Sequence, residues 1–165
     1  MNLIPELFRH NSMMNMRLIA ACRDLTADQL DATATGTYGS IAATLVHIAN
    51  SQRSYAARLL DVPRPERLTE HPFPGWPALA GHMTEGDSAL ELAVAQSDLD
   101  REVVVTGDDP PGAWSMPVGL FLLQAINHGT EHRSQVATIL TQLGIEPPNM
   151  DGWTYIEASG QLIPV

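Results

Sequence analysis

His128 and His132 lie four positions apart in a segment, residues 118–143, whose apolar side chains recur with helical spacing. At about 100° per residue, two helical positions four apart differ by only about 40°, so both rings face the apolar side of the helix or its edge. Such a pair can bind a single divalent metal ion. Alternatively, each ring forms a hydrogen bond with a neighbouring group, because buried polar groups need partners. The spacing therefore predicts either half of a metal site or two structural histidines.

A third metal ligand would have to come from elsewhere in the chain. Besides carboxylates, the other candidates are four histidines: His10, His47, His71 and His82. His71 and His82 flank a proline-rich loop, and we expect solvent to surround them. His47 lies about 100° from the apolar stripe of a predicted helix, beside small or hydroxyl residues. Such a position is typical of a helix flank, and equally of a narrow cavity, so spacing alone leaves the role of His47 open.

The polar residues around the pair have assignable roles. Glu131 is about 100° from His132 around the helix. This angle predicts a side chain that lies in solvent or contacts a metal ligand, rather than a catalytic base. Arg133, near the apolar edge, is expected to pair with a carboxylate, either within the fold or at an interface with a partner. Gln135 falls close to His128, and we expect it to hold the free nitrogen of that ring. Three tryptophans are expected to pack at the rim of the fold rather than form a substrate wall: Trp76, Trp114 and Trp153.

Four amphipathic helices must position these side chains. Apolar periodicity predicts them over residues 5–23, 40–60, 78–97 and 118–143. Gly81 and Gly86 interrupt the third, and each lowers its helix propensity. Pro77 is suited to open that helix, and Gly144 is suited to end the fourth.

The connections between these helices are mostly loops. Thr26 and Gln29 have the spacing of a capping box, which predicts a short helical turn. Three consecutive valines, residues 103–105, predict a short strand, and "GDDPPG" after them predicts a turn. The tail with "DGWTYI" is expected to fold back on the helices. The sequence therefore predicts an all-α fold: a four-helix bundle with a long loop and a short β-like insert before the last helix, forming one domain over residues 1–165.

Composition excludes several classes of function. The 165 residues carry a net charge of −10 and no basic cluster, which disfavours nucleic acid and anionic membranes as partners. All nine basic residues are arginine, so neither a Walker-type phosphate loop nor a lysine Schiff base can form. No segment resembles a signal peptide or a membrane span. A single cysteine, Cys22, excludes an internal disulfide, and we expect a cytoplasmic protein.

Two stretches resemble the DinB family of proposed metalloenzymes. These are "TYGSIAATLVHIANSQRSYAARLL" and, about seventy residues later, "AINHGTEHRSQVATILTQLGI". The most specific element is His-x-x-x-His-Arg-x-Gln followed by an apolar run and Leu-Gly. This sequence meets it with His128, His132, Arg133, Gln135, Leu143 and Gly144. The first helix is similar to that of the family in the placement of Asn11 and Asn15.

The resemblance implies a four-helix bundle that holds a divalent metal ion through His47, His128 and His132. Zinc, nickel, iron or manganese would suit three neutral nitrogens. Many relatives carry a glutamate five positions after the histidine of the second helix, where this chain has Gln52. If that glutamate tunes the site in relatives, its replacement leaves one fewer negative charge near the metal.

The resemblance also indicates a type of chemistry. Relatives are similar to thiol-dependent enzymes that use bacillithiol or mycothiol, including S-transferases and a maleylpyruvate isomerase. We therefore expect a metal-dependent transferase or hydrolase that acts on a small molecule, with a low-molecular-weight thiol as a candidate cofactor. Relatives often pair through helix faces, so we also expect a homodimer.

Two other functions compete with this expectation. "HGTEH" matches the His-x-x-Glu-His string of inverted zinc proteases, in which the glutamate is the general base. We disfavour this because little chain follows His132 to supply the remaining ligand and the chamber of such a protease. The other alternative is a non-catalytic metal-binding or structural dimeric bundle, favoured by Gln52 and by the lack of a clear acid–base pair.

Overall fold

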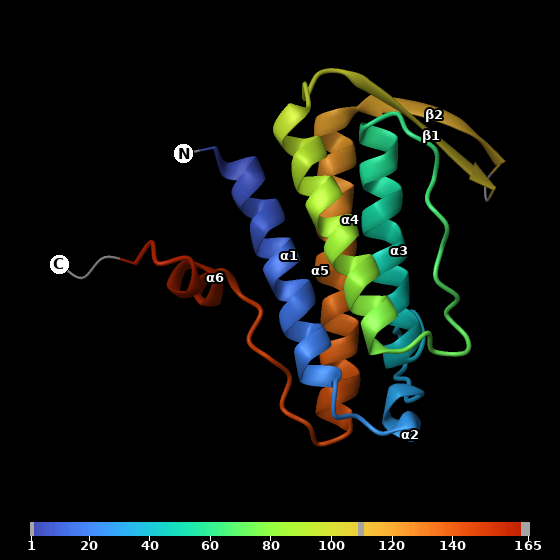
Figure 1. The fold of residues 1–165 in the computed structure, drawn as a ribbon, viewed down its shortest axis with the longest axis vertical. Helices are drawn as coiled ribbons and strands as arrows, with labels where there is room; N and C mark the ends of the chain where they lie inside the picture. Colours follow the sequence, from blue (N-terminus) through green and yellow to red (C-terminus); the bar gives the residue numbers. More distant parts are fainter. Residues whose placement is uncertain (1, 109–110, 163–165) are drawn as a thin grey trace.

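The computed structural model describes residues 2–108 and 111–162, and four long helices form its body (Figure 1). These are α1 (Leu3–Cys22), α3 (Ile41–Leu59), α4 (Trp76–Gln96) and α5 (Val118–Gln142). Each agrees with a predicted helix to within two residues at either end. The predicted all-α four-helix bundle, with its long loop and β insert before the last helix, is confirmed.

The helix ends follow local capping rules. The side chain of Ser40 accepts a hydrogen bond from the Ala43 amide and starts α3. Thr26 and Gln29 form both hydrogen bonds of the predicted capping box at the start of α2 (Ala27–Leu30). After α5, Gly144 has a φ of 72°, a left-handed conformation that glycine adopts without steric cost.

Two apolar clusters form the core of the bundle. Along each of the four long helices, buried polar residues separate the part that joins one cluster from the part that joins the other. One cluster gathers the halves of the helices near α2, with Leu18, Ile41, Leu45, Met83 and Ile139 among its buried members. The other gathers the opposite halves, with Phe8, Leu59, Leu90, Val118 and Phe121. The intervening buried polar residues include Asn11, Asn15, Gln52, Asp87 and Arg133. The core is therefore polar at the level where α5 carries its histidines.

A two-stranded hairpin connects α4 to α5 and lies across one end of α3 (Figure 1). Strand β1 (Glu102–Asp108) confirms the predicted strand and pairs antiparallel with β2 (Pro111–Pro117). The second strand was not predicted, because "PGAWSMP" has two prolines, a glycine and no β-branched residue. The predicted turn overlaps the strand ends, and its residues 109–110 lie outside the described part of the chain.

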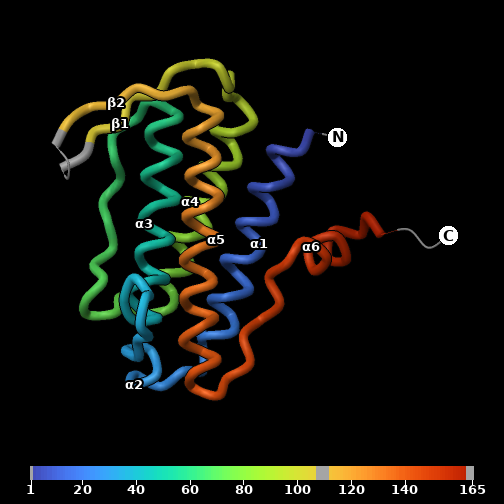
Figure 2. Tube along the Cα trace, turned by 180° about the vertical axis from the view of Figure 1, so that it is seen from behind, coloured from blue at the N-terminus to red at the C-terminus, as the bar shows by residue number. Residues whose placement is uncertain are grey.

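The tail returns along α1, as predicted, and ends in α6 (Gly152–Ala158). In Figures 1 and 2, α6 stands off the bundle beside α1. His10 Nε2 lies 3.2 Å from the carbonyl oxygen of Met150, and the Tyr155 hydroxyl donates to the Glu6 carboxylate. No residue of α6 is buried. Within the described residues, no helix has both the length and the apolar character that a membrane span requires.

Candidate metal centre

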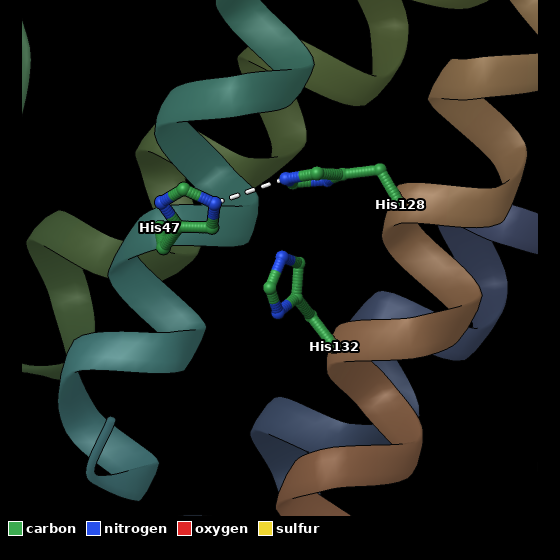
Figure 3. A group of neighbouring side chains, drawn as sticks. All are labelled: His47, His128 and His132. Atoms are coloured by element: carbon green, nitrogen blue, oxygen red, sulfur yellow. Dashed lines mark hydrogen bonds between the residues drawn. The ribbon is translucent and has the colours of Figure 1, made fainter. Parts of the chain in front are cut away.

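Three histidine rings from two helices converge at one point (Figure 3). His47 comes from α3, whereas His128 and His132 come from α5. Each of the three offers a ring nitrogen, and these nitrogens all lie within 4.8 Å of one another. The Nε2 atoms of His47 and His128 are 2.9 Å apart. The structure therefore brings together the three histidines that the family resemblance implied.

His47 lies on the flank of α3 and is half-buried, so the ring is neither fully exposed nor part of the apolar core. The apolar stripe of α3 packs into the bundle, which places His47 at the side of the helix that faces α5. Ser51, one turn later, has its hydroxyl oxygen 3.5 Å from His128 Nε2. The His47 side chain is 19% exposed, so solvent still reaches the cluster.

Electrostatics keep two of the rings neutral. Burial, together with the neighbouring rings of His132 and His47, lowers the pKa of His128 to about 3. Burial, followed by the effect of His132, also lowers the pKa of His47, although Glu70 opposes that shift. Neutral imidazole is the form that binds metal, so the rings need not lose protons at neutral pH before binding.

Gln135 orients one ring of the cluster, and that ring is His132. The Gln135 side-chain oxygen lies 2.9 Å from His132 Nδ1 and also accepts a hydrogen bond of 3.0 Å from the Tyr38 amide. The prediction that Gln135 would hold His128 is therefore wrong, because the side chain extends along α5 towards the ring three positions earlier. With Nδ1 engaged, His132 turns Nε2 towards the other rings.

Aromatic and acidic side chains cover the outer side of His47. The Tyr38 ring stacks on the His47 ring with centroids 4.0 Å apart, and its hydroxyl donates to the Glu70 carboxylate. Glu70 Oε1 lies 3.8 Å from His47 Nδ1. Both residues belong to loops, where no periodic pattern marks the side chains that face a site, so sequence analysis did not identify them.

A buried polar network supports α5 behind the histidines. Arg133 Nη1 donates to Asn11 Oδ1 at 2.6 Å and to Asn15 Oδ1 at 2.8 Å. Asn15 Nδ2 in turn donates to both oxygens of the Asp87 carboxylate, at 3.0 and 3.3 Å. Among the described residues no carboxylate lies within ion-pair distance of Arg133, so the predicted pairing within the fold is wrong, and Asn15 links Arg133 to Asp87 instead. A Cβ at Gly129 would lie 2.6 Å from Asn11 Oδ1, so this glycine lets α1 approach α5 closely enough for the network to form.

Gln52 belongs to this polar layer. It is 2% exposed, and its Cβ faces Gly86 on α4. Burial raises the pKa of the neighbouring Asp87 carboxyl, and Gln52 is the last of the groups that oppose this rise. The replacement of a family glutamate by Gln52 therefore changes the charge of the buried layer between α3 and α4.

Other predicted positions have mixed outcomes. His71 and Glu131 are exposed, as expected. The prediction that His82 is solvated is wrong: it is buried on α4, and Arg53 Nη1 lies 2.8 Å from its Nδ1. Trp76 packs against Phe73, whereas Trp114 is 41% exposed and Trp153 is 68% exposed.

The donor set fits a divalent metal ion. Two imidazole nitrogens that bind one tetrahedral zinc ion, each at about 2.0–2.1 Å, are about 3.3 Å apart. The Nε2 atoms of His47 and His128, at 2.9 Å, are close to this separation. Three neutral nitrogens suit zinc, nickel, iron or manganese alike. With three protein ligands, at least one coordination position stays available for a small molecule, as in reactive rather than structural sites. The cluster could therefore hold a metal ion in a form that permits chemistry.

Comparisons with known proteins agree with this architecture. The model of the DinB family matches residues 1–162. No curated protein sequence matches the chain. A crystal structure of a DinB-like protein from Bacillus cereus has a similar fold, with a TM-score of 0.68 and 17% identity over 88% of this chain and 94% of that chain. At that identity the structural likeness concerns the fold alone. Because the family model covers nearly the whole sequence, the chain belongs to the DinB family.

Proposed function

We propose that the protein is a metal-dependent enzyme that transfers a group to or from a small molecule, or hydrolyses one. The observation that carries the proposal is the convergence of three ring nitrogens, from His47, His128 and His132, within 4.8 Å of one another. Their partly solvent-exposed position suits access by a small molecule. Cytoplasmic location belongs to the same proposal, since the single cysteine, Cys22, is free and buried.

The residues around the cluster have distinct tasks in this proposal. A divalent ion, when bound, would lower the pKa of a water molecule or thiol that it coordinates. His47, His128 and His132 supply neutral nitrogens and leave room for such a molecule. Tyr38 and Tyr55 border the cluster, with the Tyr55 ring centroid 5.6 Å from that of His128. These rings restrict the approach of water and give an apolar substrate a surface to contact.

A low-molecular-weight thiol is the cofactor that we propose. Membership of the DinB family supports it, because relatives resemble enzymes that use bacillithiol or mycothiol. A transferase of this kind joins the thiol sulfur to an electrophilic carbon, while the displaced group leaves with its electron pair and the thiol proton passes to solvent. The proposal excludes nucleic acid and membranes as partners, in line with the net charge of −10.

The test begins with the metal. Protein purified without chelators or added metals would be analysed for its elemental content, and each candidate ion would be titrated into the metal-free form. The loaded protein would then be assayed with small thiols and chlorodinitrobenzene as the electrophile, with the metal-free protein as control. We expect a metal-to-protein ratio near one and thiol consumption that depends on the metal. If no divalent ion binds stoichiometrically, the proposal is wrong.

Self-association is a separate proposal, and exposed apolar side chains favour it. Leu3 and Leu7 on α1 line a groove of about 490 Å³ against α6, and Trp153 on α6 is 68% exposed. We propose that a second copy of the chain covers this surface, which would give a homodimer. A non-catalytic dimeric bundle would use the same surface, and it is the alternative function if thiol and electrophile do not react.

Light scattering tests the dimer directly. Leu7→Arg should shift the protein from dimer to monomer, because a charged side chain would be buried at the interface. Leu92→Arg, at an exposed leucine on α4, is the matched control and should leave the dimer intact. A monomeric mass for the unmodified protein would contradict the proposal.

A further inference from the structure

Glu70 places a carboxylate beside the outer ring nitrogen of His47. Its Oε1 atom lies 3.8 Å from His47 Nδ1, whereas His47 Nε2 points into the histidine cluster. Glu70 belongs to the loop that joins α3 to α4, so it approaches the ring from outside the bundle. The two nitrogens of this ring therefore face different partners.

His47 Nδ1 is an atom that needs an acceptor. It is buried and has no hydrogen-bond partner within the described residues, whereas His132 Nδ1 is paired with Gln135. When Nε2 of a neutral imidazole binds a cation, the ring proton must be on Nδ1, which then acts as a donor. Metal-binding histidines almost always give this proton to a carboxylate, a backbone carbonyl or water. In this structure, Glu70 is the carboxylate beside that atom.

Neighbouring groups keep Glu70 close to this nitrogen. The Tyr38 hydroxyl donates to both carboxylate oxygens, at 3.1 and 3.2 Å, while its ring stacks on His47. Arg67 Nη2 lies 3.8 Å from Glu70 Oε1. The Glu70 side chain is partly exposed and belongs to a loop, so it has room to move. A movement of about 1 Å would bring its carboxylate to normal hydrogen-bond distance from His47 Nδ1.

We propose that Glu70 is a positioning residue of the metal centre. It accepts the Nδ1 proton of His47, fixes the orientation of that ring and strengthens the binding of the cation at Nε2. The proposal rests on the proposed function, since it requires that the three histidines bind a metal ion. It also gives the α3–α4 loop a role that no helix periodicity reveals.

Zinc affinity, measured by competition with a chromophoric chelator, tests the proposal. Glu70→Gln should bind zinc about 10- to 100-fold more weakly than the unmodified protein. Glu66→Gln, an exposed position in the same loop that loses the same charge, should change the affinity by less than about twofold, because screened surface charges contribute little. Glu70→Asp, which keeps the carboxylate on a shorter side chain, should fall between the unmodified protein and Glu70→Gln.

Cobalt gives a readout that a purely structural role would not change. With Co²⁺ in place of zinc, the visible absorption bands of Glu70→Gln should shift relative to those of the unmodified protein and of Glu66→Gln. If the unmodified protein binds neither zinc nor any other divalent ion, the proposed function itself is wrong. If it binds zinc and Glu70→Gln matches Glu66→Gln in both affinity and spectrum, the role of Glu70 alone is overturned. Equal melting temperatures of the metal-free variants would verify that folding is unaffected.

Discussion

The Nε2 atoms of His47 and His128 lie 2.9 Å apart, although 81 positions separate the two residues in the chain. Burial lowers the pKa of both rings, so neither tends to supply an extra proton to the contact. If both rings kept their protons on Nδ1, two lone pairs would face each other, which is unfavourable in a site of low dielectric. Either one ring donates from Nε2, or a cation between the two nitrogens satisfies both.

Replacement of His128 separates binding from folding. His128→Ala removes one of three nitrogens, so we expect stoichiometric zinc binding to disappear. Its ring is only half-buried and lies against other imidazoles, so the free energy of unfolding of the metal-free protein should change by no more than about 1 kcal/mol. Isothermal titration and urea unfolding measure the two quantities. His71→Ala, at an exposed histidine, should leave both unchanged. Loss of the fold in His128→Ala would instead indicate a structural cluster.

Asp87 should give the stability of the protein a recognisable pH dependence. Burial is the largest influence on this carboxyl and raises its pKa from 3.8 to about 7, although Asn15 and Arg133 oppose the shift. A carboxyl whose pKa is raised on folding binds its proton more tightly in the folded state. Its contribution is therefore fully present below pH 3.8 and is lost as the pH rises through about 7.

The measurement compares the unmodified protein with Asp87→Asn by urea unfolding at about pH 5 and about pH 8. Relative to the variant, the unmodified protein should lose about 2–3 kcal/mol of stability between these two values. His47 and His128 have lowered pKa values and act in the opposite direction, since they reduce stability as the pH falls. Both proteins contain these histidines, so their effect cancels in the difference. A difference that does not vary with pH would show that Asp87 is ionised throughout.

Sequence reasoning predicted the bundle because its signals are local. The spacing of apolar residues, the Thr26 capping box and Gly144 each act within a few residues, and the helices formed as expected. The relation between His128 and His132 was predictable for the same reason, since one helix sets it. The position of His47 beside these two residues was not predictable from spacing, because it depends on how α3 and α5 pack. Only the family resemblance implied that position.

The residues that sequence reasoning missed or misplaced have side-chain directions that no local signal in the sequence determines. Tyr38 and Glu70 lie in loops, where side-chain direction has no period that could be read from the sequence. Gln135 had the correct helical angle, but whether it would contact the ring at 128 or at 132 depended on side-chain torsions. His82 was predicted to be solvated because it follows a proline-rich loop, yet it lies on the side of α4 that packs against α3, where Arg53 contacts its ring.

Gln135 should contribute to metal affinity through the ring that it holds. Gln135→Ala removes the acceptor for His132 Nδ1 and for the Tyr38 amide. We expect about tenfold weaker zinc binding, because loss of an outer partner of a ligand typically costs 10- to 100-fold. Gln142→Ala, at an exposed position of the same helix, should have no effect. Unchanged affinity in Gln135→Ala would show that packing alone orients His132.

The two glycines of α4 should respond oppositely to the same substitution. Nothing lies within 4 Å of a Cβ placed at Gly81, so Gly81→Ala should raise the free energy of unfolding by about 0.5–1 kcal/mol through better helix propensity. A Cβ at Gly86 would lie 3.1 Å from the backbone nitrogen of Arg53 and 3.1 Å from Gln52 Cβ, so α4 would have to move away from α3.

Such overpacking typically costs about 1–3 kcal/mol, which exceeds the gain in propensity, so Gly86→Ala should destabilise the protein by about 1–2 kcal/mol. A change in the packing of α4 on α3 should also disturb His47, which α3 carries, so zinc affinity should fall in Gly86→Ala and stay unchanged in Gly81→Ala. Urea unfolding and zinc competition, applied to both variants, measure the two effects. Equal stabilisation by the two substitutions would mean that α3 and α4 are not packed as closely as the glycine contact indicates.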